Sequence, residues 1–166
     1  MTLQTNIAAA IQVIFTGDAD LGANAFNLDK FGDISLSPGV ASKQADLVFA
    51  DKRTLAGLTT EDLDLAGGSL SDPVGTALTF VKVKALLIRA AAGNVGNIRV
   101  GGDVNAALLG FVAANDQIDI PAEGVLLLVA PGDGYTVTAG TGDILQIENT
   151  GASSADYDIV VIGTSA

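Results

Sequence analysis

The sequence of 166 residues contains no histidine, no cysteine and no tryptophan. Histidine is the side chain that most often changes charge near neutral pH, and it is a leading general base and metal ligand. Cysteine supplies the thiol nucleophile and the soft metal ligand. Their absence removes most routes to nucleophilic, redox or transition-metal catalysis. It also leaves the redox compartment open, because a chain without cysteine forms no disulfide in any compartment.

Charged residues are scarce as well. They make up 16% of the chain, against about 25% in an ordinary soluble domain. Hydrophobic residues make up 49%, and 20 residues are glycine. The length fits one domain with a sizeable core. A surface with so few charges favours contact with other subunits, since large exposed apolar patches promote association. We therefore expect a single domain that oligomerises.

Positive charge is missing from the second half of the chain. Residues 1–99 hold 10 acids and all 8 bases, and residues 100–166 hold 9 acids and no base. Binding to a phosphate backbone needs clustered lysine and arginine, so the sequence argues against a nucleic-acid partner. Two interpretations of the acidic half stay open. It is either a solvated surface that keeps the protein in solution or a surface that docks on a basic partner.

Long hydrophobic runs are also missing. No segment reaches the ~18 apolar residues that a membrane span needs, and the run from Ala85 to Ala92 is interrupted by Arg89. The first basic residue is Lys30, so the N-terminus lacks the basic start of a secretory signal. We expect synthesis in a cytoplasm and no membrane partner.

The chain does contain many short apolar runs between glycine or proline turns. They cover residues 11–15, 26–31, 45–49, 61–65, 78–90, 98–100, 117–120, 124–130, 135–138, 143–148 and 157–162. Short strands at a spacing of about 8–12 residues predict an antiparallel sandwich, jelly roll or barrel. We expect an all-β, single-domain antiparallel β-sandwich over residues 1–166, jelly-roll-like. Residues 78–90 favour a long strand, and a helix over residues 85–92 is the alternative.

The first 25 residues form the least regular part of the pattern. Residues 2–10 are small and polar without a firm period. We expect residues 1–25 to be an N-terminal arm or an edge strand. An arm of this kind orders by packing against a neighbour, and addition of a strand to a partner's sheet is one known mode of assembly.

Close pairs of acids are the only candidate metal ligands in this chain. The pairs are Asp18 with Asp20, Asp62 with Asp64, Asp116 with Asp119, and Asp156 with Asp158. Calcium takes 6–8 oxygen ligands, and none of the pairs lies in an EF-hand pattern. Asp62 and Asp64 share one face of their predicted strand. We assign structural or solvating roles to the pairs and name no catalytic, cofactor-binding or metal-binding residue.

Other candidate sites are weak too. A glycosidase needs two carboxylates, but the chain lacks tryptophan, the usual platform for a sugar, and its only tyrosines are Tyr135 and Tyr157. The glycines of residues 93–97 and 101–103 lack the Gly-Lys-Ser/Thr of a phosphate loop and predict turns. On the strand within residues 78–90, Lys82 and Lys84 share one side and Arg89 takes the other. We expect these bases to pair with acids of a neighbouring strand or subunit.

Several segments together suggest a family. Asp62–Gly75 leads into Leu78–Arg89, and Ile98–Gly102, Ile120–Gly124 and Asp156–Gly163 follow. From about Leu58 to the C-terminus this series resembles the small β-sandwich proteins that decorate the capsids of tailed bacteriophages. The resemblance covers roughly two thirds of the chain and rests on the style of these segments, since no chemical motif is shared.

The resemblance implies a non-enzymatic capsid decoration, or cement, protein without cofactor. Such a protein forms a homotrimer on the capsid exterior, binds the major capsid protein and stabilises the mature shell by bridging capsomers. The expected location is therefore the virion. Two alternatives stay open: a β-module associated with a phage tail or baseplate, and a sugar- or calcium-binding β-sandwich module. The lack of tryptophan weighs against sugar binding, and a calcium-dependent melting shift would favour the calcium module.

Overall fold

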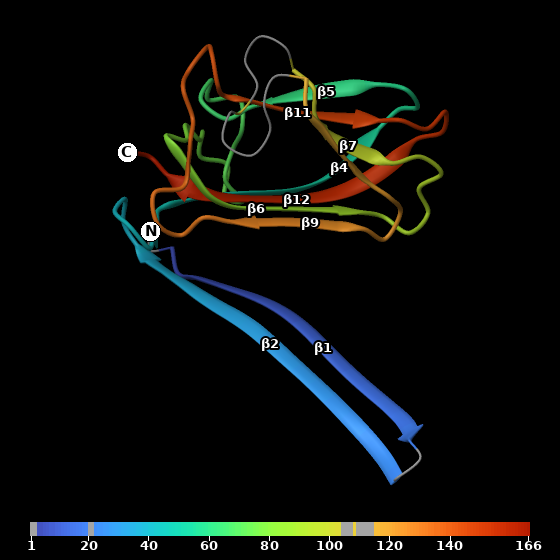
Figure 1. Cartoon of the computed structure of the whole chain (residues 1–166). Coiled ribbons are helices and arrows are strands. Elements are labelled where there is room, and N and C mark those ends of the chain that lie inside the picture. Colours follow the sequence, from blue (N-terminus) through green and yellow to red (C-terminus); the bar gives the residue numbers. More distant parts are fainter. Residues whose placement is uncertain (1–2, 20–21, 104–107, 109–114) are drawn as a thin grey trace.

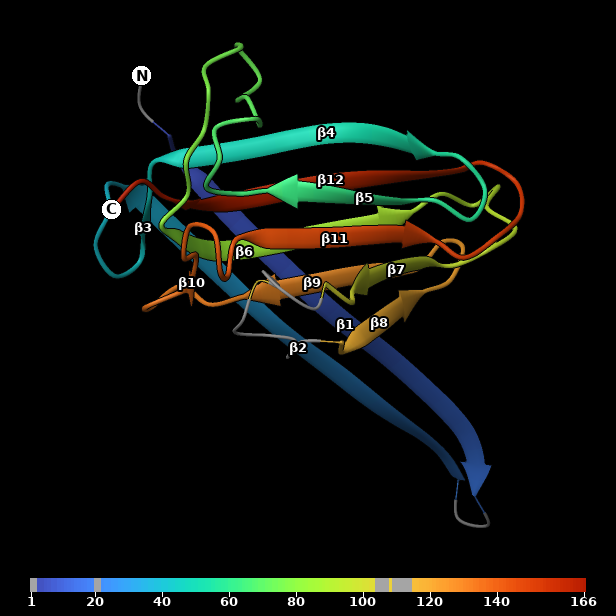
Figure 2. The same cartoon turned by 90° about the horizontal axis from the view of Figure 1, so that it is seen from above.

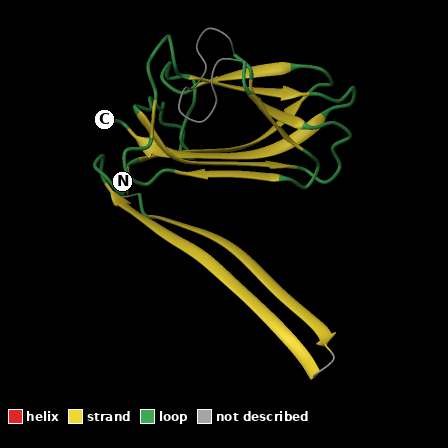
Figure 3. Ribbon diagram, in the orientation of Figure 1, coloured by secondary structure: helices red, strands yellow, loops and turns green. Residues whose placement is uncertain are grey.

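The computed structural model describes residues 3–19, 22–103, 108 and 115–166. These residues form strands, turns and loops and contain no helix (Figure 3). Accordingly, the described part of the chain has no helix that could cross a membrane. The prediction of an all-β chain is confirmed. The alternative of a helix over residues 85–92 is wrong, because this segment lies largely in a strand, Lys82–Ala90.

The predicted apolar runs fall on strands almost one for one. The strands are β1 (Thr5–Ala19), β2 (Gly22–Pro38), β3 (Gln44–Ala45), β4 (Leu47–Leu55), β5 (Thr60–Asp64), β6 (Lys82–Ala90), β7 (Ile98–Gly101), β8 (Gln117–Ile120), β9 (Val125–Val129), β10 (Tyr135–Thr136), β11 (Ile144–Asn149) and β12 (Ala155–Thr164). Alternation of apolar and polar residues, together with the turns between the runs, explains this agreement.

Two antiparallel sheets face each other and form the sandwich (Figures 1 and 2). One sheet has the order β10-β6-β12-β4, and β9 also pairs with β6. The other sheet has the order β5-β11-β7-β8. Strands far apart in sequence are neighbours, as in the pairing of β4 with β12 from Leu47↔Gly163 to Leu55↔Ala155. The last strand of the chain, β12, therefore lies in the middle of a sheet, between β6 and β4.

The strand order is that of a jelly roll. When the short β10 is set aside, the body strands are β4, β5, β6, β7, β8, β9, β11 and β12 in the part of the chain that the structure describes. Numbered one to eight, they form sheets of order 1-8-3-6 and 2-7-4-5. This is the arrangement of two interlocked Greek keys that defines the double-sheet jelly roll. The jelly-roll-like sandwich expected from the sequence is the fold that the structure shows.

The main core lies between the two sheets and follows from period-2 alternation. On β12 the residues Ala155, Tyr157, Ile159 and Val161 are buried between the sheets, and the alternating residues Asp156, Asp158 and Val160 are half-buried. On β11 the side chain of Ile147 is buried between half-buried neighbours. Burial of each large apolar side chain contributes about 1.5–3 kcal/mol. The alternation of apolar residues therefore accounts for the core between the two sheets.

The first two long strands leave the sandwich. β1 and β2 pair with each other from Thr5↔Leu36 to Ala19↔Gly22, and their hairpin projects away from both sheets (Figure 1). We call this hairpin, residues 5–38, the arm. At about 3.3 Å per residue, the 15 residues of β1 span roughly 50 Å. The arm expected over residues 1–25 thus continues to Pro38 in the structure, because the apolar run 26–31 pairs with β1 rather than with the body.

The base of the arm packs on the outer face of the five-stranded sheet. A second cluster of buried residues forms there, with Leu36 from the arm, Ala45 from β3, and Ala85 and Ile162 from the sheet. Ile7, Ile34, Val48, Val129 and Val160 are among the partly buried residues that pack against this cluster. A short parallel pairing of β2 with β3, at Ser37↔Gln44 and Pro38↔Ala45, joins the arm to the body.

Candidate functional site

Asp62, Asp64 and the other described acids of the predicted pairs contact other groups within the fold. Asp62 and Asp64 flank the buried Leu63 and lie on one face of β5, as predicted. Gln146 Nε2 donates to Asp62 Oδ1 at 2.8 Å. The backbone N–H groups of Ala66 and Gly67 donate to Asp64 Oδ1, at 3.0 and 2.6 Å. Asp64 therefore fixes the turn that follows β5.

The pair Asp156 and Asp158 lies on the outer face of β12, where each acid contacts a neighbouring strand. Thr54 Oγ1 donates to Asp156 Oδ1 at 2.6 Å, and Lys52 Nζ lies 3.7 Å from Asp156 Oδ2. Arg89 donates to Asp158 Oδ2 from Nε at 3.1 Å and from Nη2 at 2.7 Å. The predicted pairing of Arg89 with an acid of a neighbouring strand is therefore confirmed.

Asp119 pairs with a base across the β7–β8 ladder. Arg99 donates to its two carboxylate oxygens, from Nε at 2.7 Å and from Nη2 at 3.2 Å. The hydrogen bond with Arg99 lowers the pKa of Asp119 below its usual value. Asp116 lies outside this pairing, in the turn before β8. Asp18 lies in β1, and Asp20 lies outside the described residues.

The described acids gather in no larger cluster. Among residues 3–19, 22–103, 108 and 115–166, no group of three or more carboxylates could hold a metal ion. The carboxylates that are described in contact with arginine, threonine, glutamine or backbone N–H groups tie strands and turns together. Their geometry serves the fold.

The two lysines of β6 find partners other than the expected acids. Lys82 Nζ donates to Thr136 Oγ1 at 3.1 Å. Lys84 is the extra residue of a β-bulge, because Val83 pairs with Gly163 and Ala85 with Ile162. Its ammonium group donates to the carbonyl oxygen of Gly132. Burial lowers the pKa of Lys84. The bulge breaks the alternation that placed the two lysines on one side of the strand.

A partly buried ionic network between the two sheets was not predicted. Arg53 of β4 donates to Glu61 Oε2 from Nε at 2.8 Å and from Nη2 at 2.6 Å. Tyr157 of β12 donates its hydroxyl to Glu61 Oε1 at 2.6 Å. The hydrogen bond to Glu61 raises the pKa of Arg53, and burial is the first cause that raises the pKa of Tyr157. Both oxygens of Glu61 are occupied, so this network crosslinks the sheets.

The most apolar groove among the described residues lies where the arm leaves the sandwich. A groove with a volume of about 250 Å³ separates the arm from the outer face of the five-stranded sheet. It is lined by Asn6, Ile7, Ala8, Ala85, Leu87, Leu127, Val160 and Ile162. All but one of these side chains are apolar, and Leu87, Leu127 and Val160 are only half-buried. We call this surface the arm groove.

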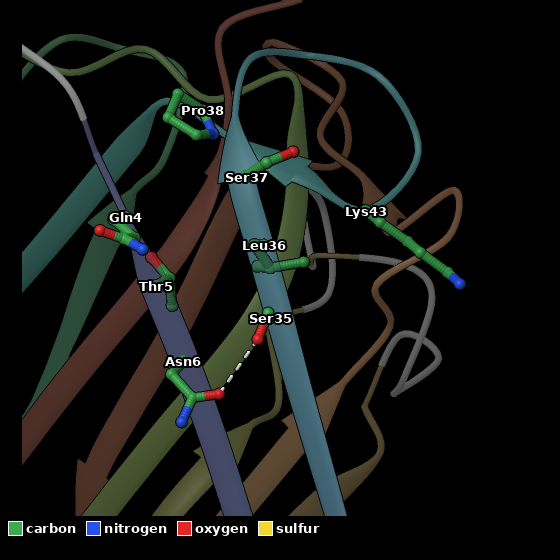
Figure 4. A pocket seen from close by; sticks show the side chains of 8 residues that line it. All are labelled: Gln4, Thr5, Asn6, Ser35, Leu36, Ser37, Pro38 and Lys43. Atoms are coloured by element: carbon green, nitrogen blue, oxygen red, sulfur yellow. Dashed lines mark hydrogen bonds between the residues drawn. The ribbon is translucent and has the colours of Figure 1, made fainter.

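A second hollow lies at the polar root of the arm (Figure 4). It is lined by residues on both strands of the arm, among them Asn6, Ser35 and Leu36. Ser35 Oγ donates to Asn6 Oδ1 at 3.3 Å, and Lys43 lines the hollow from the loop that follows β2. No carboxylate lines it. This hollow is an open crevice between the arm and the following loop, and it holds no acid–base pair.

The arm and the arm groove are the candidate functional site. Sequence reasoning found the arm in part, from its small polar start, but not the groove. The groove joins residues 6–8, 85–87, 127 and 160–162, and their proximity depends on the strand order. Compared with known proteins, the chain matches no family model, no curated protein and no solved structure.

Proposed function

We propose that the chain is a non-enzymatic structural protein of a bacteriophage virion. It binds the outer surface of the capsid, contacts the major capsid protein and stabilises the mature shell by bridging capsomers. The observation that carries the proposal is the arm. It is a two-stranded ladder of roughly 50 Å that projects from a jelly-roll body (Figure 1).

The physical argument starts from the stability of a hairpin. A two-stranded hairpin alone is marginally stable in water, and it gains stability when one of its faces packs on another surface. Among the residues whose side chains the structure describes, the arm contacts the body at its base. Ile7, Ile34 and Leu36 join the cluster on the outer sheet face, and Ser37 and Pro38 pair with β3. The rest of the arm extends beyond the sandwich (Figure 1). An element with this geometry is suited to contact a second molecule.

The resemblance of residues 58–166 to capsid decoration proteins names that second molecule. A protein that binds the expanded shell, and not its precursor, stabilises the expanded shell by mass action. A homotrimer multiplies the effect, because its second and third contacts are made within one complex. The paired carboxylates and the inter-sheet network of Glu61 support a structural role, since they hold the fold together.

The proposal is tested by sedimentation with empty heads assembled from the major capsid protein of the phage genome that encodes the chain. We expect the purified chain to sediment with expanded heads and not with unexpanded heads. In a shortened-arm variant, Asn-Gly replaces residues 10–31 and joins Ala9 to Gly32, which pair in the ladder. A two-residue turn of this type suits an antiparallel pair.

We expect the shortened-arm variant to lose binding to the expanded heads while its sandwich stays folded. The proposal is contradicted if the full chain does not sediment with expanded heads, or if it binds isolated phage tails instead. A chain that binds heads equally well without residues 10–31 would contradict the role given to the arm.

A further inference from the structure

We propose that the free edge of β9 pairs with β9 of a second copy of this chain, as two antiparallel strands related by a twofold axis. One part of the inference rests on the proposed function, because it assigns this contact to copies that a capsid holds close together. The contact itself involves only strands of the sandwich. It can therefore be tested without a capsid.

β9 is an apolar strand without a buried residue. Its residues, Val125–Val129, are all valine or leucine, and none of them is buried. Val125 is 55% exposed, and the other residues of the strand are half-buried. The neighbouring β6, by contrast, buries most of its residues. Since removal of apolar surface from water is favourable, β9 offers a surface that a partner can cover with a gain in stability.

One side of β9 has no strand beside it. β9 lies at the border of the five-stranded sheet, next to β6 and on the opposite side from β4 (Figure 2). In the described part of the chain it pairs with β6 alone, from Ala85↔Val129 to Arg89↔Val125. The strands of the arm pair elsewhere, β1 with β2 and β2 with β3. β9 is therefore an edge strand.

The backbone bonds at the two ends of the β6–β9 ladder show which residues of β9 face β6. Ala90 N–H donates to the carbonyl oxygen of Gly124 at 3.0 Å, and Ala130 N–H donates to that of Lys84 at 2.8 Å. Opposed residues in an antiparallel ladder alternate between hydrogen-bonded and non-hydrogen-bonded pairs. The residues of β9 that bond to β6 are therefore the even-numbered ones.

The odd-numbered residues of β9 face the free edge. Val125, Leu127 and Val129 direct their N–H and C=O groups away from β6, and no other backbone group of the described chain bonds to them. Unpaired backbone groups in this alternating order are the template to which an extended strand adds. The edge therefore identifies its occupant as a β-strand.

Charge distinguishes this edge from the other borders of the sandwich. Charged residues, prolines and bulges on an edge strand discourage pairing with another chain. The charged residues of the other edges are Asp51, Lys52 and Arg53 of β4, Glu61, Asp62 and Asp64 of β5, and Asp119 of β8. β9 has no charge and no proline, and it keeps a continuous register with β6. Among the described edges longer than two residues, it therefore lacks this protection.

The strand of this chain that fits the edge best is β9 itself. In an antiparallel pair centred on Leu127, this residue lies opposite Leu127 of the second copy. The remaining opposed pairs are Leu126 with Leu128 and Val125 with Val129. This register brings the outward backbone groups together, and every cross-strand pair is aliphatic. Pairing with β4, β5 or β8 of the second copy would place charged residues against valine and leucine instead.

The contact is small and joins only two copies. A twofold axis makes it isologous, so it ends with a pair and cannot form the ring of a trimer. On a capsid it links copies of neighbouring trimers. Two short strands form a marginal pair on their own in water, so free copies associate weakly through β9. A support that holds the copies close raises their effective concentration and favours the pair.

The test traps this weak contact in solution with cysteine, which the chain lacks. Leu127→Cys places one thiol opposite its counterpart in the pair, where Cα atoms about 5.5 Å apart suit a disulfide. Oxidised glutathione takes up the two electrons released when the disulfide forms. We expect a crosslinked species of twice 16.6 kDa, both for the full chain and for the shortened-arm variant.

Val125→Cys is the matched control, because Val125 lies on the same face of the same strand and is more exposed than Leu127. In the proposed register the two copies of Val125 lie roughly 14 Å apart along the pair, beyond the reach of a disulfide. We expect no crosslink in Val125→Cys alone and a crosslink when it is mixed with Val129→Cys. If Val125→Cys alone crosslinks as readily as Leu127→Cys, the reaction follows exposure and the inference is overturned.

A proline tests whether the backbone makes the contact. Leu127→Pro removes an N–H group that points to the free edge and leaves the bonds of Leu126 and Leu128 to β6 in place. We expect it to abolish the crosslink between Val125→Cys and Val129→Cys while thermal unfolding still reports a folded sandwich. A crosslink that survives the proline overturns the inference.

The outcomes separate this inference from the proposed function, because the crosslinking uses no capsid. A chain that crosslinks in the proposed register but does not sediment with expanded heads contradicts the proposed function alone. A chain that binds expanded heads but gives no crosslink in Leu127→Cys contradicts the inference alone, and the edge is then left for a strand of another protein.

Discussion

The sandwich and the arm are built from the same kind of strand but differ in what their apolar residues contact. In the sandwich, Ile159 and Ile147 point between two sheets and are fully buried. In the arm, Ile7 and Ile34 reach the body only at the base, and the ladder continues outward with the same alternation. The difference shows that an amphipathic strand pattern does not by itself place a segment in a core. Burial also requires a second surface, and among the described side chains the fold of one chain provides it for the sandwich and for the base of the arm.

The largest effect that separates the two regions comes from deletion of apolar side chains. We expect Ile159→Ala to lower the free energy of unfolding by about 3 kcal/mol, because it leaves a cavity in the core. Val13→Ala in the arm changes it by less than ~0.5 kcal/mol. Urea unfolding of both variants measures the comparison. Equal losses would mean that the arm belongs to the cooperative core.

Removal of the inter-sheet network gives the next largest effect, and only in the sandwich. We expect Glu61→Gln to lower the free energy of unfolding by about 1–2 kcal/mol, since the half-buried Arg53 and the buried Tyr157 lose their charged partner. Asp51→Asn is the matched control, because Asp51 also pairs with Arg53 but is more exposed. Its loss is expected to stay below ~0.5 kcal/mol. A larger loss in the control than in Glu61→Gln would contradict the network.

Acid titration tests the contribution of the Arg99–Asp119 pair to the stability of the sandwich. The pKa of Asp119 is lower in the folded chain than its usual value of 3.8. Its contribution is therefore present above pH 3.8 and is lost as the pH falls through the folded pKa. Because Asp119 is partly exposed, we expect less than ~1 kcal/mol. Asp119→Asn should flatten the fall in stability below this pH in thermal unfolding. An unchanged acid profile in the variant would contradict the assignment.

The smallest effect is expected where the arm is shortened. Replacement of residues 10–31 by Asn-Gly removes the outer ladder but keeps Ile7, Ile34 and Leu36 on the sheet. We expect the free energy of unfolding of the sandwich to change by less than ~0.5 kcal/mol, because no described core residue is removed. Hydrogen exchange of the β12 amides measures the same quantity locally. A large loss of protection in β12 would show that the arm supports the body.

The strands of the body could be predicted from the sequence because their signal is local. Period-2 runs and the turns between them placed β5, β7, β8, β9 and β11 within a few residues. The order of the strands could not be predicted. The pairing of Leu47–Leu55 with Ala155–Gly163 joins segments about a hundred residues apart, and no local pattern encodes such a choice. The sequence therefore predicted a jelly-roll-like fold class, and the structure shows the order of its strands.

The candidate site was less predictable for the same physical reason. The arm groove depends on strand order, and the network of Arg53, Glu61 and Tyr157 crosses between sheets. Lys84 contacts the carbonyl oxygen of Gly132 and not the expected acid, because a single extra residue in β6 shifts the register. The run 26–31 shows another limit, since its alternation is real but its pairing partner is β1. Alternation fixes which residues share a face and leaves open what that face meets.

The most direct test of the account is the mass of the chain in solution, measured by light scattering for the full chain and the shortened-arm variant. The account predicts that the full chain is a multiple of 16.6 kDa, three times this mass for the proposed homotrimer, and that the variant is a single folded chain. A full chain that stays single at every concentration, or a variant that keeps the mass of the full assembly, would contradict the claim that the arm acts between molecules.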